Sequence, residues 1–122
     1  MQQNIRSVLV VDDDEDVRDS VAFVLRDEGY QVETAGNGKE ALERLDHMPA
    51  PGLMLLDLMM PVMSGWATLD ALRDRRDAPP VLVVSAGVPP SPAGAMDYLR
   101  KPVDVDMLLR KVAAAFTGAP LV

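Results

Sequence analysis

Apolar residues in this chain gather in short runs, separated by longer segments with helical periodicity. Three runs of four consecutive apolar residues, at 8–11, 53–56 and 81–84, are typical of strands buried on both faces of a parallel sheet. Residues 30–35 alternate between apolar and polar positions and favour another strand, and a shorter strand is expected over 96–99. The pattern therefore predicts five strands.

Between these strands, apolar residues recur at spacings of three and four positions, which indicates amphipathic helices. The first of these segments ends at Gly29, and Asn37 is a candidate cap for the second. The apolar faces of the four predicted helices consist, in chain order, of Val17, Val21, Val24 and Leu25; of Ala41, Leu42 and Leu45; of Trp66, Leu69 and Leu72; and of Val105, Leu108, Leu109, Val112 and Phe116. Strands that alternate with helices imply an α/β fold, in which a parallel sheet is covered on both faces and the crossovers are right-handed.

Length and composition narrow the classes of protein that fit. The 122 residues predict a single domain over 1–122, with a short tail at 117–122. The chain has no cysteine, which excludes disulfides and thiolate metal sites. A net charge of −7 argues against a nucleic-acid surface, and no apolar stretch approaches the length of a membrane span. We therefore expect a cytoplasmic protein with neither nucleic acid nor membrane as a partner.

Polar residues follow directly where the apolar runs end. Asp12 and Asp13 follow the first run, and Asp57 follows the run that begins at Leu53. Ser85 follows the next run, and Lys101 closes the last predicted strand. The carboxyl ends of parallel strands meet at one edge of a sheet, which is where open α/β sheets place their sites. We therefore expect these polar side chains to lie together.

The carboxylates of the expected cluster suit a divalent cation and a phosphoryl group. Carboxylates gathered in a small volume repel one another, and a like-charged pair about 4 Å apart costs about 1 kcal/mol in water and about 4 kcal/mol near a protein surface. A divalent cation relieves this repulsion, and oxygen ligands with room for water suit Mg²⁺. Asp57 would then be both a ligand and a nucleophile that attacks phosphorus to give an acyl phosphate. The cation, Lys101 and the Ser85 hydroxyl would stabilise charge on the equatorial oxygens.

Four segments of the chain closely resemble the receiver domains of two-component response regulators. They are VLVVDDD at 8–14, LDLMMPVMSG at 56–65, VSA at 84–86 and DYLRKP at 97–102. The resemblance covers nearly the whole chain, and the segments occur in the family's order. It implies a flavodoxin-like three-layer sandwich, in which a five-stranded parallel sheet has the order 2-1-3-4-5 and helices lie on both faces.

The resemblance also implies roles at the acidic cluster. Asp57 would accept a phosphoryl group from the phosphohistidine of a histidine kinase or phosphotransfer protein. The domain would itself catalyse this phosphorylation and the later dephosphorylation, and it would signal through contacts with a downstream protein. Asp13 and Asp57 would bind Mg²⁺ directly, the backbone carbonyl of Met59 would add a ligand, and Asp12 would orient metal-bound water.

The same resemblance assigns the polar residues of the last two strands and exposes a departure from the family pattern. Ser85 and Lys101 would respond to the phosphoryl group, and Tyr98 resembles the aromatic switch that turns inward on activation. Ser85 and Lys101 lie closer in sequence than the family pattern has them. Residues 87–94, with three prolines, therefore predict an irregular loop or a single turn, so that the family's fourth helix is shortened or missing. That helix belongs to the face through which receivers usually dimerise or bind outputs.

Other interpretations of the same residues stay open. Glu15 and Asp16 are better explained as an acidic helix start, and Tyr98 is alternatively a half-buried strand residue. A degenerate receiver would be a docking module without phosphorylation. A Mg²⁺-dependent aspartyl phosphohydrolase would use the Asp-x-Asp of 12–14, although 122 residues leave no substrate-covering cap. Trp66 is expected to be partly exposed near the site, and four methionines are expected to fill the core and a loop: Met54, Met59, Met60 and Met63.

Overall fold

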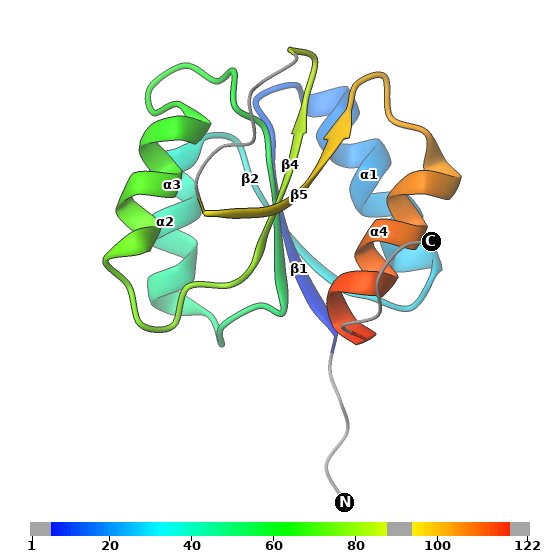
Figure 1. Ribbon diagram of the computed structural model, residues 1–122, viewed down its shortest axis with the longest axis horizontal. Helices are drawn as coiled ribbons and strands as arrows, with labels where there is room; N and C mark the ends of the chain where they lie inside the picture. Colours follow the sequence, from blue (N-terminus) through cyan, green and yellow to red (C-terminus); the bar gives the residue numbers. More distant parts are fainter. Residues whose placement is uncertain (1–5, 88–93, 118–122) are drawn as a thin grey trace, which may run out of the picture.

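Figure 1 shows the computed structural model of the chain, which describes residues 6–87 and 94–117. The strands are β1 (Ser7–Val11), β2 (Gln31–Ala35), β3 (Leu53–Leu56), β4 (Val81–Ser85) and β5 (Ala95–Arg100). The helices are α1 (Glu15–Asp27), α2 (Gly38–His47), α3 (Gly65–Arg73) and α4 (Val105–Thr117). Each predicted strand and helix is present, with small differences at the ends. Thr117, the first residue of the predicted tail, is the last residue of α4, and residues 118–122 lie outside the described range.

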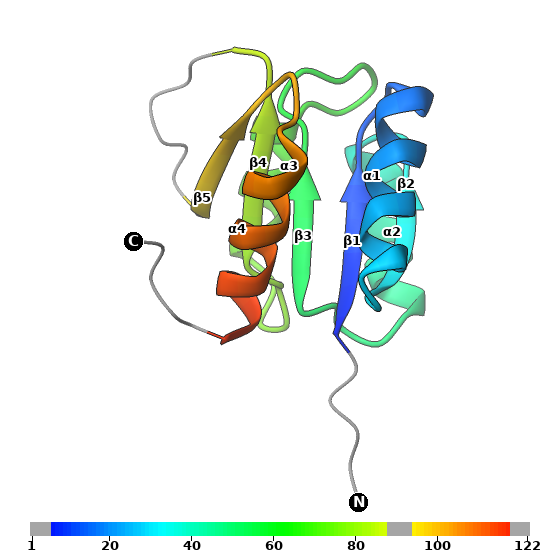
Figure 2. The ribbon, with the colours of Figure 1, turned by 90° about the vertical axis from the view of Figure 1, so that its right-hand side faces the viewer.

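The five strands form one parallel sheet in the order β2-β1-β3-β4-β5, which confirms the flavodoxin-like topology (Figure 2). Helices α2 and α3 cover one face of the sheet, and α1 and α4 cover the other (Figure 1). Successive strand residues alternate between the two cores: Val8 and Leu53 pack toward α1 and α4, whereas Leu9 and Met54 pack toward α2 and α3. All four side chains are fully buried, which is why their runs lack polar positions.

A side chain just before each of the four helices accepts from the first free backbone N–H groups; before α4, Asp104 accepts from the Met107 N–H at 3.1 Å. Asp14 accepts from the N–H groups of Asp16 and Val17 at 3.0 and 3.2 Å, so the acidic segment after β1 does start a helix. Asn37 caps α2, as expected, and Ser64 caps α3. Such caps contribute about 1 kcal/mol each. They fix where the helices start relative to the strand ends before them.

The connection between β4 and β5 is short. Among the residues that the structure describes, no helix lies between these strands. The predicted irregular loop or single turn falls mostly on residues 88–93, which lie outside the described range. The β4–β5 register shifts by one residue after the Val81–Ala95 pair, so that Leu82 pairs with Asp97 and Met96 is left over. No helix in the described ranges is long and apolar enough to cross a membrane.

Candidate functional site

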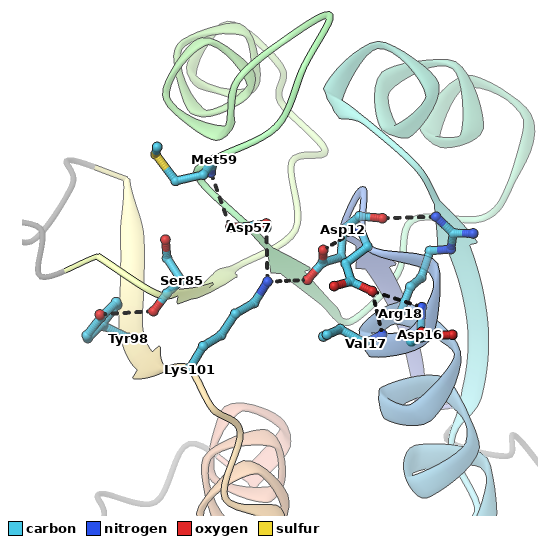
Figure 3. Close-up of polar contacts among 10 residues, drawn as sticks. Asp12, Asp16, Val17, Arg18, Asp57, Met59, Ser85, Tyr98 and Lys101 are labelled. Carbon is cyan, nitrogen blue, oxygen red and sulfur yellow. Dashed lines mark hydrogen bonds and ion pairs between the residues drawn. The ribbon is translucent and has the colours of Figure 1, made fainter.

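The carboxyl ends of the strands bring the predicted polar residues together (Figure 3). Asp12 directly follows β1, Asp57 follows β3 and Lys101 follows β5. The Lys101 ammonium lies 2.8 Å from an Asp12 carboxylate oxygen and 3.3 Å from one of Asp57. Residues far apart in the sequence therefore meet because parallel strands β1 and β3 are neighbours and β5 ends at the same edge.

Asp57 is a buried carboxylate whose position is set by the backbone. Only 4% of the surface of Asp57 is exposed. Its backbone N–H donates to the Val11 carbonyl at 3.0 Å, which continues the hydrogen bonding of the sheet. One carboxylate oxygen accepts from the Met59 N–H at 3.1 Å, and the other faces Lys101. Both carboxylate oxygens of Asp57 therefore have a donor, as a buried carboxylate requires.

Gly65 lets the start of α3 approach the end of β3. Its N–H donates to the Leu58 carbonyl at 3.0 Å, and a Cβ at this position would lie 2.4 Å from the Asp57 carbonyl oxygen. Val62, in the loop between Leu58 and Gly65, has a φ of 70°, which is unusual for a β-branched residue. In the sequence, Gly65 is only the last residue of the segment 56–65, and its close approach to Asp57 could not be predicted because it depends on how α3 packs.

For both Asp57 and Lys101, burial and the pairing of opposite charges shift the pKa in opposite directions. Burial raises the pKa of Asp57, and the nearby Asp12 carboxylate raises it further, against the Met59 N–H and Lys101, which favour the ionised form. Burial by itself would lower the pKa of Lys101, but its hydrogen bonds and charge pairing with Asp12 and Asp57 outweigh burial and raise it. Lys101 therefore stays an ammonium, while its charge and the Met59 N–H only partly offset the cost of ionising the buried Asp57 carboxyl.

Three carboxylates are close enough to share a cation. Asp12, Asp13 and Asp57 each offer an oxygen, and these oxygens lie within 4.8 Å of one another. Mg²⁺ holds oxygens at about 2.1 Å, so two ligands of one ion lie at most about 4.2 Å apart. The Asp13 side chain is exposed, so a rotation of this side chain or a bridging water would close this small difference if an ion bound. The hard oxygen donors and the excess negative charge fit Mg²⁺.

Asp12 is held in position by contacts to its side chain and to its backbone carbonyl. Its second carboxylate oxygen accepts from the Asp14 N–H at 2.9 Å, and its carbonyl accepts from the Arg18 guanidinium at 3.0 Å. Arg18 had no part in the sequence-based prediction. Its position one turn into α1 gives no signal that it reaches back to the end of β1.

Ser85 and Tyr98 are connected directly. Ser85 is buried at the end of β4, and Tyr98 is partly buried on the neighbouring β5. The Tyr98 hydroxyl donates to the Ser85 carbonyl at 3.2 Å and also contacts the Gly87 carbonyl. The predicted switch residue therefore touches the backbone of the predicted phosphoryl-responsive residue, and its role in switching stays a prediction.

Two exposed side chains follow β3: Met59 lies in the loop after this strand, and Trp66 lies in the first turn of α3. Trp66 is 42% exposed, as expected. Met59 is 70% exposed, so the expectation that it fills the core or the loop is wrong, whereas Met54 is fully buried. The Met59 backbone turns inward to donate to Asp57, which leaves the side chain pointing out. The metal role predicted for its carbonyl stays a prediction.

Comparisons with known proteins agree with this geometry. The family model described as the response regulator receiver domain matches residues 8–113. Response regulator RR06 of Streptococcus pneumoniae is 34% identical over 113 residues, which cover 88% of this chain and 52% of that protein. The chain thus spans about half the length of the curated relatives it matches.

Solved structures match over nearly the whole chain. The chemotaxis protein CheY4 of Vibrio cholerae, crystallised at low pH, has a TM-score of 0.85 and 31% identity, covering 92% of this chain and 99% of that one. The response regulator TrrA of Thermotoga maritima, solved in complex with Mg²⁺-BeF, has a TM-score of 0.83 and 30% identity, covering 91% and 99%.

Proposed function

This chain belongs to the response regulator receiver domains of two-component systems, and from that premise we propose that Asp57 is its phosphoacceptor. The phosphodonor would be the phosphohistidine of a histidine kinase or phosphotransfer protein, and the phosphorylated domain would act on a downstream protein. The observation that supports this assignment is the meeting of Asp57, Lys101 and two further carboxylates at one edge of the sheet.

Each group has a step to perform. An Asp57 carboxylate oxygen attacks phosphorus, the phosphorus–nitrogen bond of the donor breaks, and the electron pair stays on the imidazole. Lys101, now shared between Asp12 and Asp57, turns toward an oxygen of the arriving phosphoryl group, and the Ser85 hydroxyl donates to another. The Met59 N–H keeps the Asp57 carboxylate oriented for attack.

Mg²⁺ is the cofactor that we propose for this step. Asp13 and Asp57 would hold it, with the Met59 carbonyl as a further ligand and Asp12 orienting its water. The ion would supply positive charge against the phosphoryl oxygens. A receiver with 30% identity was solved with Mg²⁺-BeF, which supports this assignment.

Intact mass spectrometry after incubation with acetyl phosphate and Mg²⁺ tests the proposal. We expect the wild type to gain one phosphoryl group and Asp57→Asn to gain none. Asp70→Asn is the matched control, because it removes an exposed carboxylate on α3 and should be labelled like the wild type. Labelling of Asp57→Asn at the wild-type level would contradict the assignment.

Two further outcomes would point to the other functions that the sequence left open. A wild type that binds Mg²⁺ but is never labelled would be a docking module. Steady release of phosphate from a simple phosphomonoester, with no accumulation of the acyl phosphate, would indicate a phosphohydrolase.

A further inference from the structure

The backbone of Asp12 is held from two sides at the point where the chain leaves β1. Its N–H donates to the Ala35 carbonyl at the end of β2 at 3.1 Å, and its carbonyl accepts from the Arg18 guanidinium on α1 at 3.0 Å. In Figure 3, Asp12 lies between Lys101, which pairs with its carboxylate, and Arg18, which reaches its backbone. The two cations therefore act on different parts of the same buried residue.

Arg18 contacts a neutral carbonyl although acids lie next to it in the sequence. Asp19 follows it directly on α1, yet within residues 6–87 and 94–117 Arg18 forms no ion pair. A Cβ added to Gly36, just after β2, would lie 3.4 Å from the same guanidinium nitrogen that reaches Asp12. The guanidinium therefore lies at the ends of both β1 and β2, and its partner is a backbone group of the candidate site.

The carbonyl that Arg18 holds belongs to the peptide group between Asp12 and Asp13. A peptide group is planar, so a donor that holds this oxygen also restrains the direction in which the chain continues to Asp13. The Asp13 side chain is exposed, and none of the described residues forms a hydrogen bond or an ion pair with it. The position of the Asp13 carboxylate is therefore set by the backbone on either side of it.

We propose that Arg18 is a positioning residue for the divalent cation, because it holds the peptide group that directs Asp12 and Asp13 toward the ion. This inference rests on the Mg²⁺ role proposed for the site. The oxygens of the three acids lie within 4.8 Å of one another, close to the separation that two ligands of one Mg²⁺ require. Mg²⁺ demands near-ideal geometry, so a small loss of order in this peptide group should weaken its binding.

Electrostatics alone predicts the opposite effect of removing Arg18. A guanidinium beside an acidic cluster repels a second cation, so its loss by itself should tighten the binding of Mg²⁺. A side chain that orders the ligands should instead weaken binding when it is removed. The sign of the change in affinity therefore separates a positioning role from an effect of charge.

Isothermal titration calorimetry with MgCl₂ and no phosphodonor measures this sign. We expect Arg18→Met, which keeps the apolar stem and removes the donor, to raise the Kd for Mg²⁺ about tenfold. Arg18→Lys keeps a cationic donor, and its Kd should stay within about threefold of the wild type. If Arg18→Met fails to fold, Arg18→Gln serves instead, because its amide is too short to hold the Asp12 carbonyl, and it should show the same loss.

Arg44→Met is the matched control for the loss of an arginine. Arg44 lies on α2, where it pairs with Glu33 and Glu40, and its side chain is 44% exposed. Surface ion pairs of this kind contribute little, so the Kd of Arg44→Met for Mg²⁺ should lie within about twofold of the wild type.

Labelling by acetyl phosphate over a range of Mg²⁺ concentrations gives a second measurement. In Arg18→Met, the Mg²⁺ concentration for half-maximal labelling should rise by the same factor as the Kd, while the rate at saturating Mg²⁺ stays within about twofold of the wild type. A merely structural role would lower the rate at saturating Mg²⁺ as well.

Unchanged or tighter binding of Mg²⁺ by Arg18→Met would overturn the inference, and so would a loss confined to the saturating rate. A wild type that binds no Mg²⁺ would overturn the proposed cofactor and this inference with it. The calorimetric result stands even if Asp57 is never labelled, because it needs no phosphodonor. Failure of the inference and failure of the proposed phosphoryl transfer are therefore distinguishable.

Discussion

Two lysines of similar burial serve opposite purposes in this domain. The Lys101 side chain is 18% exposed, and its ammonium lies 2.8 Å from Asp12 and 3.3 Å from Asp57, which directly follow β1 and β3. The Lys111 side chain is 17% exposed and lies 2.9 Å from Asp97, with the Tyr98 carbonyl as its second acceptor. Lys101 bridges acceptors that follow two neighbouring strands, whereas both acceptors of Lys111 lie on β5, and only Lys101 lies in a cluster of acids that fits a cation.

The difference lies in the balance of charge. Lys101 pairs with the carboxylates of Asp12 and Asp57, and the Asp13 carboxylate lies close enough to share an ion with both, so the acids outnumber the ammonium. Around Lys111, one ammonium faces one carboxylate and a neutral carbonyl. Uncompensated charge near a low-dielectric interior attracts counter-ions, whereas a neutral pair does not. In this domain, the lysine that lies among an excess of acids is the one at the candidate site, and the lysine paired with a single acid is not.

Removing the ammonium of Lys101 or of Lys111 should give the largest difference in the rate of phosphoryl labelling. We expect Lys101→Met to lower the rate of labelling by acetyl phosphate by about 10²–10³-fold, because a donor aimed at developing charge is lost. Lys111→Met should be labelled within about twofold of the wild type, because Lys111 contacts Asp97 and Tyr98 rather than the acidic cluster. Time courses by intact mass spectrometry measure both rates. Equal losses in the two variants would show that Lys101 has no special part in phosphoryl transfer.

A substitution next to the Asp57 backbone tests the packing of the site without removing a charge. Gly65→Ala places a Cβ 2.4 Å from the Asp57 carbonyl oxygen and should lower the free energy of unfolding by about 1–3 kcal/mol. Gly87→Ala is the matched control, because nothing lies within 4 Å of its added Cβ, and it should change stability by less than about 0.5 kcal/mol. Urea titrations measure both variants. A tolerated Gly65→Ala would mean that α3 can withdraw from the strand end.

The smallest expected effect concerns pH. Because burial raises the pKa of Asp57 in the folded state, its ionisation destabilises the fold as pH rises from the value of a free aspartate, about 3.9, through the folded pKa. In the absence of divalent cations, Asp57→Asn should therefore be more stable than the wild type at pH 7. This advantage should shrink as the pH falls and vanish below the free-aspartate value, where both states of the wild type are protonated.

Denaturant titrations of the two proteins across this pH range, with chelator present, test that prediction. Added Mg²⁺ should reverse the order at pH 7, because a ligand at about 100 times its Kd stabilises the folded wild type by about 2.7 kcal/mol. An Asp57→Asn advantage that is constant from pH 3 to pH 7 would contradict the raised pKa.

Much of this arrangement could be predicted from the sequence. The apolar runs at 8–11, 53–56 and 81–84 are buried on both faces. Their lack of polar residues predicted this burial, because a strand with one exposed face would alternate. Asn37 was a recognisable cap because capping is a local interaction. The polar residues at the strand ends met as expected, since parallel strands direct their carboxyl ends to one edge.

The tertiary structure alone decided how those residues are paired. Lys101 lies nearer to Asp12 than to Asp57, Gly65 touches the backbone of Asp57, and Lys111 reaches the edge of β5. These contacts depend on strand order, register and helix placement, which join residues distant in the chain. Periodicity reports which side of an element is buried, because that preference is local, but distances between elements are set only when the whole core packs.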